Sequence, residues 1–473
     1  MTILEMTKNP QPQTQVEEAV QKAKISQAKL NAIVTLVDPN SQLEQLKGKE
    51  RGLLYGVPIA LKDNVTTKGI KTTASSHILD NYIPVFNAHI VDKLAEAGAI
   101  VIAKTSMDEL AMGGTNLSAA TGPVHNPYDF ECMAGGSSGG SAALVAAGVV
   151  PMAIGSDTGD SVRKPASYCG IVGMKPTYGR ISRYGIIPYS SSLDHVGFFT
   201  RSVEDAAVTL EVLAGRDDRD MTSSYREVPH YLQEMSSDIR GKKIAVIKNV
   251  VDAITHDETK KLFQNLLKSL AEKGAIITEV VLDEKLMKAA LPTYYLIANC
   301  EATANHSNLD AIRFGVQQLA ESAEEIMIRS RTQGFSALIR KRFVIGSYGL
   351  MEENQDKLFR QAQRVRRLIV EEVKRSLMDA DVMIAPASSS GAPKLKDTSR
   401  DQLKDSYLIA ENHMVLGNFT GYPSCTVPMG LVEGMPLGVN LTAKAFDEVN
   451  LLGLCLAVEQ ITGLKDVAQE VKE

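Results

Sequence analysis

The sequence predicts one large α/β domain in which helices and strands alternate. Residues 89–105 show this order most clearly, because an amphipathic stretch reaches Gly98 and an apolar run at 99–103 follows at once. A helix that stops at glycine and leads into a buried strand is typical of α/β folds. The order recurs at 243–282, where a strand, a helix and a second strand are expected. The chain of 473 residues shows no internal repeat and no long linker, which favours a single domain.

The N-terminal part is expected to contain an arm, a helix and a strand. Residues 1–14 are polar and contain proline, which predicts a flexible arm, so the domain itself is expected to span 15–473. Apolar residues spaced on one face predict a helix at 15–34. The apolar run 57–61 predicts a short strand that leads directly into the polar segment 62–64.

Later elements are predicted from small residues, capping residues and apolar spacing. Small residues at 140–148 predict a closely packed helix. Ser202 and Thr255 each stand three positions before an acidic residue, a pattern typical of helix starts. The amphipathic stretch 358–377 predicts a long helix, within a mainly helical insert expected near 285–375. Further strands are expected at 149–154, 381–386, 424–430 and 438–443, and a final helix at 450–461.

The composition is that of a globular protein and excludes several functional classes. Apolar residues make up 44% and charged residues 23%, and the net charge is −5, so nothing indicates a nucleic-acid or membrane surface. Neither a signal peptide nor a run of about 18 apolar residues is present, which predicts a cytoplasmic protein without a membrane span. Five widely spaced cysteines without a CxxC pair argue against a disulfide framework and a zinc site, so no metal is expected.

Two clusters rich in glycine and serine are the most unusual feature of the chain. They lie at 135–141 and 155–161, and a run rich in alanine and valine joins them. Glycine permits sharp turns and close backbone approach because it lacks a Cβ atom. We therefore expect two tight loops side by side, which would bring together Ser137, Ser138, Ser156 and Ser161.

Ser161 is a candidate nucleophile and Lys62 a candidate base. Ser161 lies in a Gly-Asp-Ser turn after a predicted strand, but a serine hydroxyl needs a neighbouring base at neutral pH. The histidines nearest to the clusters, His125 and His195, are expected to be structural. Lys62 follows an apolar strand, where burial would lower its pKa and make it a usable base. On these residues alone, Lys62 could equally be an ordinary charge at a strand end.

The two clusters also carry a family resemblance. GGSSGGSAALVAAG, followed by GSDTGDSVRKPASYCGIVGMKPTYGRISRYG, resembles the signature of the amidase signature family. Segments such as GVPIALKDN (56–64), AGAIVIAKTSMDELAMGG (97–114) and YPSCTVPMG (422–430) are similar to it as well, so the resemblance covers about residues 15 to 466. It implies one α/β/α domain around a mixed sheet of about eleven strands.

The resemblance implies catalytic roles for three residues. Lys62 matches the base, Ser137 the bridging serine on a cis peptide bond, and Ser161 the nucleophile. Neutral Lys62 would draw a proton through Ser137 while Ser161 attacks a carboxamide carbon, ammonia would leave, and water would resolve the acyl-enzyme. The developing oxyanion would accept hydrogen bonds from the backbone of Thr158, Gly159 and Asp160.

Within the family, the chain is most similar to the A subunits of tRNA-dependent amidotransferases. The segments that carry this likeness are TYGRISRYG, SSSLD, AIRFG (311–315), RKRFVIGSY (340–348) and QRVRRLI (363–369). The likeness implies a glutaminase within a heterotrimer, in which the B subunit binds tRNA, ATP and magnesium and a small C subunit wraps the pair. No cofactor is then expected in this chain. Arg342 and Glu411 would bind the α-carboxylate and the α-amino group of glutamine.

Asp160 departs from the family pattern, which has Gly-Gly-Ser before the nucleophile. A carboxylate beside the developing oxyanion would oppose its charge, and Lys164 could offset that effect by pairing with Asp160. The alternatives left open are therefore a free-standing amidase for another small amide, a working glutaminase subunit of an amidotransferase, and a weakened or non-catalytic protein on an amidase fold.

Overall fold

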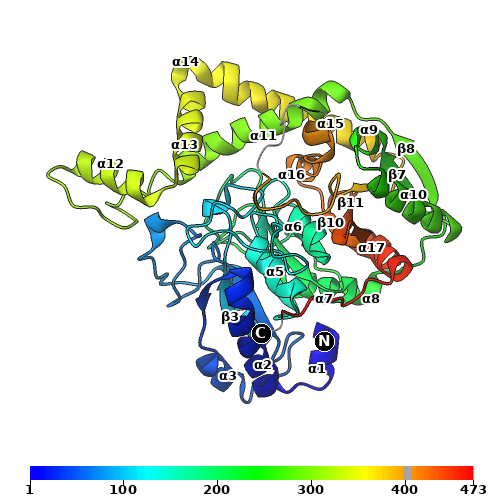
Figure 1. Ribbon diagram of the computed structural model, residues 1–473, viewed down its shortest axis with the longest axis horizontal. Helices are drawn as coiled ribbons and strands as arrows, with labels where there is room; N and C mark the ends of the chain where they lie inside the picture. Colours follow the sequence, from blue (N-terminus) through cyan, green and yellow to red (C-terminus); the bar gives the residue numbers. More distant parts are fainter. Residues whose placement is uncertain (398–403, 405, 472–473) are drawn as a thin grey trace.

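A mixed sheet of eleven strands runs through the computed structural model, which describes residues 1–397, 404 and 406–471 (Figure 1). The strands are β1 (Ile33–Leu36), β2 (Pro58–Lys62), β3 (Ile100–Thr105), β4 (Met152–Asp157), β5 (Val172–Lys175), β6 (His195–Thr200), β7 (Lys243–Ile247), β8 (Ile276–Val280), β9 (Val382–Pro386), β10 (Ser424–Val432) and β11 (Met435–Ala443). Their order across the sheet is β1-β3-β2-β4-β6-β5-β10-β11-β9-β7-β8. The predicted α/β class and the strand number implied by the resemblance are both confirmed.

The central strands bring two distant parts of the chain to one edge of the sheet. β2 pairs in parallel with β3 on one side and with β4 on the other, where Leu61 lies opposite Ile154. Parallel strands end at the same edge of a sheet, so the residues that follow β2 and β4 meet there. β2 ends with Lys62 itself, one residue later than the sequence predicted.

Helices cover both faces of the sheet. On one face, α4 (His89–Glu96), α7 (Val203–Leu213), α10 (Asp257–Glu272) and α17 (Glu448–Thr462) share one apolar cluster with the strands. On the other face lie α2 (Pro12–Leu30), α5 (Gly139–Ala146) and α6 (Arg163–Cys169), and, towards β7 and β9, α9 (Lys248–Ala253), α11 (Glu284–Asn305), α15 (Gln361–Ser376) and α16 (Val415–Thr420). The shorter elements are α3 (Asn40–Leu46), η1 (His77–Leu79), η2 (Glu109–Ala111), α8 (Tyr231–Glu234) and η4 (Ser406–Ala410). The fold is thus a three-layer α/β/α arrangement.

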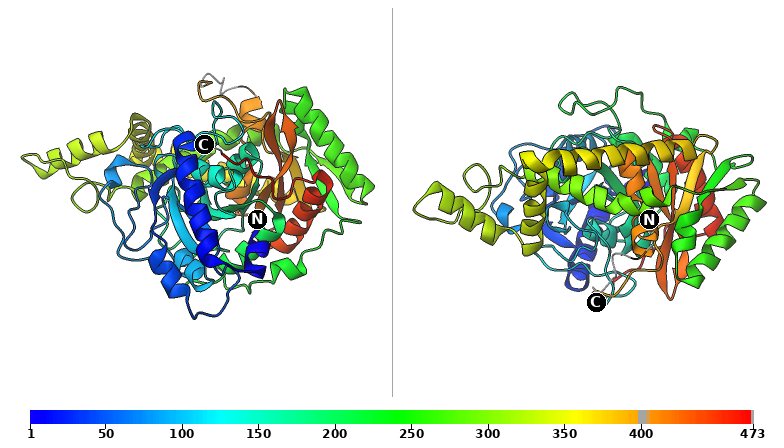
Figure 2. Two further views of the ribbon diagram at one scale, coloured as in Figure 1. Left: turned by 60° about the horizontal axis from the view of Figure 1, so that its bottom comes forward. Right: turned by 90° about the horizontal axis from the view of Figure 1, so that it is seen from above.

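The segment between β8 and β9 is helical, in agreement with the insert predicted near 285–375. Besides α11 and α15 it contains α12 (Ala323–Gly334), α13 (Ala337–Leu350), α14 (Glu352–Gln355) and η3 (Asp356–Arg360). Figures 1 and 2 show α12 projecting from the body of the molecule. The side chains of α11 and α13 pack on each other and, with nearby loops, form their own apolar cluster.

The flexible arm predicted at 1–14 is wrong, because most of it is helical and packed. α1 (Ile3–Lys8) begins with a capping box between Thr2 and Glu5, a local pattern that itself favours a helix start. Ile3 is completely buried, and the backbone amides of Ile3 and Leu4 donate to the carboxylate of Asp205 on α7 (3.0 and 3.3 Å). The start of the chain is therefore bound to the domain by a contact that sequence neighbours do not reveal.

Strands β1, β5 and β6 were not predicted either. β5 and β6 lie inside the sheet and pair with each other in antiparallel register. Every residue of both strands is buried, so they lack the alternation of apolar and polar residues that marks a half-buried strand. None of the described helices combines the length and the apolar character that crossing a bilayer requires.

Candidate active site

The two clusters rich in glycine and serine lie side by side where β2 and β4 end. The first cluster runs into the first turn of α5, and the second spans the end of β4 and the loop after it. The Ser138 hydroxyl donates a hydrogen bond to the Ser156 carbonyl (3.1 Å) and accepts one from the Ser156 amide (3.3 Å). The predicted pair of adjacent loops is therefore confirmed.

Lys62 reaches both loops from the end of β2. Its side-chain nitrogen donates to the hydroxyls of Ser137 (2.7 Å) and Ser138 (2.8 Å) and to the Ser156 carbonyl (3.2 Å). The side chain is completely buried, and burial lowers its pKa to about 7, although nearby carboxylates raise the pKa in part. A substantial neutral fraction therefore exists at pH 7. In that form the amine can accept the proton of the Ser137 hydroxyl at the same contact.

A second buried lysine, Lys104 on β3, binds the chain just after Lys62. Its nitrogen donates to the Val65 carbonyl (2.8 Å) and the Thr72 hydroxyl (2.7 Å) and lies 3.5 Å from the Asp63 carboxylate. Burial lowers the pKa of Lys104 to about 8 and raises that of Asp63. Sequence reasoning did not single out Lys104, although a lysine within an apolar strand is the same signal that drew attention to Lys62.

The loop that carries Ser161 is bound through a buried ion pair. The Asp157 carboxylate accepts two hydrogen bonds from Arg163 (3.0 and 2.9 Å) and one from the Val162 amide (3.0 Å). Burial acts to raise the pKa of Asp157, but the Arg163 guanidinium outweighs burial and leaves it well below its usual range. Arg163 is itself completely buried and donates to a carbonyl within the loop. These contacts position Ser161 and the backbone at 158–160.

Free backbone amides precede the nucleophile candidate. The amides of Gly159, Asp160 and Ser161 donate no hydrogen bond to any residue that the structure describes. Three neighbouring N–H groups without an acceptor suit the binding of a developing negative charge. The Thr158 hydroxyl donates to the Asp194 carboxylate (2.7 Å), which ties the start of this loop to the segment before β6.

Of the three residues expected to act together, two are in direct contact. Lys62 binds Ser137, whereas no hydrogen bond joins the hydroxyls of Ser137 and Ser161, both of which lie in the described part of the chain. Ser161 is only 3% exposed and follows the strand whose Ser156 carbonyl accepts from Lys62. Apo sites commonly tighten such contacts only when substrate is bound.

Gly136 and Asp108 set the position of Ser137. The peptide bond between Gly136 and Ser137 is cis, as the resemblance implied. The Ser137 carbonyl accepts from the Asp108 amide (3.1 Å), and the Asp108 carboxylate accepts from the Asn116 amide (2.8 Å). A Cβ atom on Gly136 would overlap the Asp108 carboxylate and lie 2.6 Å from the Asn116 nitrogen. Only glycine fits at this position.

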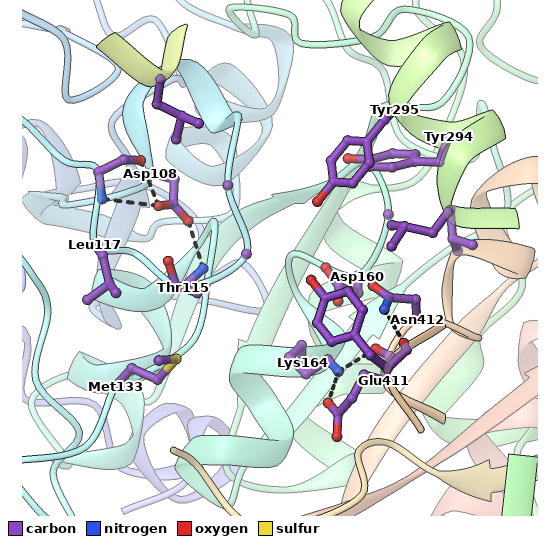
Figure 3. A pocket seen from close by; sticks show the side chains of 18 of the residues that line it. Asp108, Thr115, Leu117, Met133, Asp160, Lys164, Tyr294, Tyr295, Glu411 and Asn412 are labelled. Atoms are coloured by element: carbon purple, nitrogen blue, oxygen red, sulfur yellow. Dashed lines mark hydrogen bonds and ion pairs between the residues drawn. The ribbon is translucent and has the colours of Figure 1, made fainter. Parts of the chain in front are cut away.

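A cavity of about 500 Å³ opens beside the loop. Figure 3 shows Asp160, Lys164 and Glu411 on one side of it, with Tyr294 and Tyr295 of α11 above them. Arg342, from α13, also lines the cavity. The helical insert and the loop before Ser161, through Gly159 and Asp160, therefore line the same pocket.

The family follows from a match along most of the sequence. The family model described as Amidase matches residues 14–452. The chain belongs to the amidase family.

Named relatives of this amidase fall into two groups. The A subunit of the glutamyl-tRNA(Gln) amidotransferase of Lactobacillus acidophilus is 41% identical over 439 residues, which are 91% of this chain and 89% of the relative. The solved structure of the corresponding protein from Thermotoga maritima has a TM-score of 0.83 and 32% identity, covering 100% of this chain and 98% of that one. The peptide amidase of Stenotrophomonas maltophilia has a TM-score of 0.84 and 28% identity, covering 98% and 96%.

Arg342 of this amidase faces the pocket in a well-defined setting. Its guanidinium donates to the Tyr189 hydroxyl (2.8 Å) and lies 5.3 Å from the centre of the Tyr295 ring. These neighbours orient the guanidinium without neutralising its charge. The arrangement suits a carboxylate of the substrate, the role expected from the sequence.

Lys164 pairs with Glu411 and not with Asp160, so the expected ion pair between Lys164 and Asp160 is wrong. Burial raises the pKa of Asp160, and the nearby Lys164 charge opposes that rise only in part. The Lys164 nitrogen lies 2.9 Å from the Glu411 carboxylate and 2.6 Å from the Glu411 carbonyl. Burial acts to lower the pKa of Lys164, but Glu411 outweighs burial and raises it, so the lysine stays charged. The Lys164 amide donates to the Asp160 carbonyl (2.8 Å), so the two residues are one turn apart, but the Lys164 side-chain nitrogen is taken up by the carbonyl and the carboxylate of Glu411.

The histidines near the clusters have structural partners in this amidase. The His195 Nδ1 atom donates to the Leu193 carbonyl (2.7 Å), and burial lowers the pKa of His195 well below its usual value. His125 donates from Nδ1 to the Phe130 carbonyl (2.6 Å). Within the described ranges, no group of His, Cys, Asp and Glu side chains is arranged to bind a metal ion.

Proposed function

We propose that this amidase is the glutamine-hydrolysing subunit of a tRNA-dependent amidotransferase. The observation that carries the proposal is the contact between buried Lys62 and Ser137 in a chain 41% identical to the A subunit of a glutamyl-tRNA(Gln) amidotransferase. The contact supplies a base for amide cleavage, and the relative supplies the reaction class.

In the first half-reaction, Ser161 attacks the carboxamide carbon of glutamine. Its proton passes to Ser137, while the proton of Ser137 passes to neutral Lys62. The carbonyl oxygen becomes an oxyanion that accepts hydrogen bonds from the free amides of the loop. The C–N bond then breaks, the proton on Lys62 returns through Ser137 to the leaving nitrogen, and ammonia departs from a glutamyl ester on Ser161.

In the second half-reaction, water attacks the ester carbon. The relay through Ser137 and Lys62 takes the proton of the water and returns one to the oxygen of Ser161 as the C–O bond breaks. Glutamate leaves, and the enzyme returns to its starting state. Ammonia is the product that a carbon–nitrogen ligase would consume.

The proposed assembly is a heterotrimer that acts in the cytoplasm. A B subunit would bind the tRNA, ATP and magnesium and use the ammonia to amidate tRNA-bound glutamate or aspartate, and a small C subunit would complete the complex. The cysteines of this chain are free and buried, which suits a reducing compartment. No cofactor is assigned to this chain.

The test is ammonia release from glutamine by the chain alone and by the chain with its B and C subunits. We expect release that increases with the partners and with acylated tRNA, and a Ser161→Ala variant that loses it. Ser41→Ala, on the exposed surface of α3, is the matched control and should retain full activity. Absence of glutamine hydrolysis by the assembled wild-type complex would refute the proposal.

The second candidate is a free-standing amidase for another small amide. The likeness to the peptide amidase favours it, since that fold match is as good as the match to the amidotransferase protein of Thermotoga maritima. Turnover of simple amides by the isolated chain, without preference for glutamine, would decide in its favour. A third possibility is a weakened or non-catalytic protein because of Asp160. A covalent acyl adduct on Ser161 would exclude a non-catalytic protein, and a large gain in rate from Asp160→Gly would favour a weakened enzyme.

A further inference from the structure

The Glu411 carboxylate already has an ion-pair partner and a hydrogen-bond donor within the protein. One carboxylate oxygen lies 2.9 Å from the Lys164 nitrogen, and the other accepts from the Ser389 amide (2.8 Å). The two side chains are nearly buried, so their charges compensate each other with little screening by water. An incoming ammonium group would have to displace Lys164 in order to use this carboxylate.

Asp108, another carboxylate of the pocket, also has hydrogen-bond donors within the protein. It accepts from the amides of Thr115 (3.2 Å) and Asn116 (2.8 Å) and from the Ser118 hydroxyl (2.8 Å). These bonds fold the segment 113–118 over the first serine-rich cluster. Asp108 therefore serves the structure of the loop. Asp397, at the rim of the pocket, is exposed and its charge is screened by water.

Asp160 is different, because its carboxylate has no hydrogen bond and no ion pair with any residue in the described ranges. Figure 3 places the side chain between Tyr295 and the pair formed by Lys164 and Glu411. Burial raises the pKa of Asp160 to about 6, which leaves the group charged at neutral pH. A partly buried carboxylate without a partner is costly, and a cation bound in the pocket would offset that cost.

We propose that Asp160 binds the α-ammonium group of the amino-acid amide substrate, while Arg342 binds its α-carboxylate. The inference rests on the proposed function and names a residue that sets substrate specificity. The two charges come from different walls of the pocket, one from the catalytic loop and one from α13. An α-amino acid carries the complementary pair of charges on a single carbon atom.

The proposal also explains how a loop with Asp160 can support turnover. The Asp160 side chain binds the ammonium group, and its backbone amide remains available for the oxyanion. Once the ammonium group is bound, the charge beside the oxyanion is neutralised. An amide that lacks the α-amino group leaves that charge uncompensated, and so it is a poor substrate.

The test compares glutamine with glutaramate, which is glutamine without its α-amino group, in the complete complex. Ammonia release is measured for wild type, Asp160→Asn and Asp160→Gly, and Glu411→Gln serves as the matched carboxylate control. We expect wild type to prefer glutamine, and both Asp160 variants to lose about 10- to 100-fold of that preference, mainly through a higher KM for glutamine. Activity on glutaramate should be retained or improved, which shows that the site is folded.

Three results would overturn the inference. Wild type could use both amides equally well, the Asp160 variants could lose both activities in parallel, or Glu411→Gln alone could abolish the preference. A wild-type complex that releases no ammonia from glutamine, yet cleaves other amides, would refute the proposed function and this inference with it. A complex that hydrolyses glutamine without discriminating against glutaramate would refute the inference alone.

Discussion

The side-chain nitrogen of Lys62 lies 2.7 Å from the hydroxyl oxygen of Ser137, and both side chains are shielded from solvent. The two residues are 75 positions apart in the chain. They meet because β2 and β4 are parallel neighbours and because the first serine-rich cluster is hydrogen-bonded to the end of β4. This contact is the basis for the first two predictions.

Replacement of Lys62 by methionine should abolish amide hydrolysis with little loss of stability. The base is lost, which is expected to lower kcat by about 10²–10⁴-fold or more. The lysine is completely buried, so an apolar side chain of similar length removes a desolvation cost. Ammonia release and thermal unfolding check the two halves of this prediction. Lys68→Met, at an exposed lysine, should match wild type in both measurements.

Amide hydrolysis should increase with pH through about 7. The active base is the neutral amine of Lys62, and burial lowers its pKa from the usual value to about 7, so the neutral fraction grows as the pH rises past that point. A profile of kcat/KM between pH 5 and about 9 would show this limb. A profile that stays flat near 7 and rises only near the pKa of an exposed lysine would contradict the assignment.

Replacement of Gly136 by alanine should destroy both activity and packing at the site. The added Cβ would lie 2.6 Å from the Asn116 nitrogen and overlap Asp108, which forces the serine-rich loop to move. We expect a loss of about 1–3 kcal/mol in the free energy of unfolding and a severe loss of ammonia release. Gly114 provides a matched control, because a Cβ atom there meets nothing within 4 Å. Equal behaviour of Gly136→Ala and Gly114→Ala would show that the contact is unimportant.

Removal of one partner of the pair formed by Asp157 and Arg163 should destabilise the fold strongly. Both side chains are completely buried, so Arg163→Met leaves an unpaired carboxylate and should cost about 3–5 kcal/mol. The double variant Asp157→Asn with Arg163→Met should recover part of that loss. Urea unfolding measures both. If adding Asp157→Asn to Arg163→Met lowered the free energy of unfolding as much as an independent replacement would, the two residues would not be coupled.

Local patterns predicted most of the fold but not all of its burial. Features that depend on neighbouring residues could be predicted. They include the strand at 57–61, the helix end at Gly98 and the two clusters rich in glycine and serine. The flexible arm predicted at 1–14 is wrong. The helix there is fixed by hydrogen bonds to Asp205, about 200 positions away, and no local pattern contains that partner.

The sequence by itself determined the fold class, the family likeness and the candidates Lys62, Ser137 and Ser161. Only the tertiary structure decided which charges of the pocket are paired. Lys164 binds Glu411, which is 247 positions away, and this leaves Asp160 without a partner among the described residues. The reason is physical: ion pairing depends on distance and burial in three dimensions, and both are set by packing between segments remote in the chain.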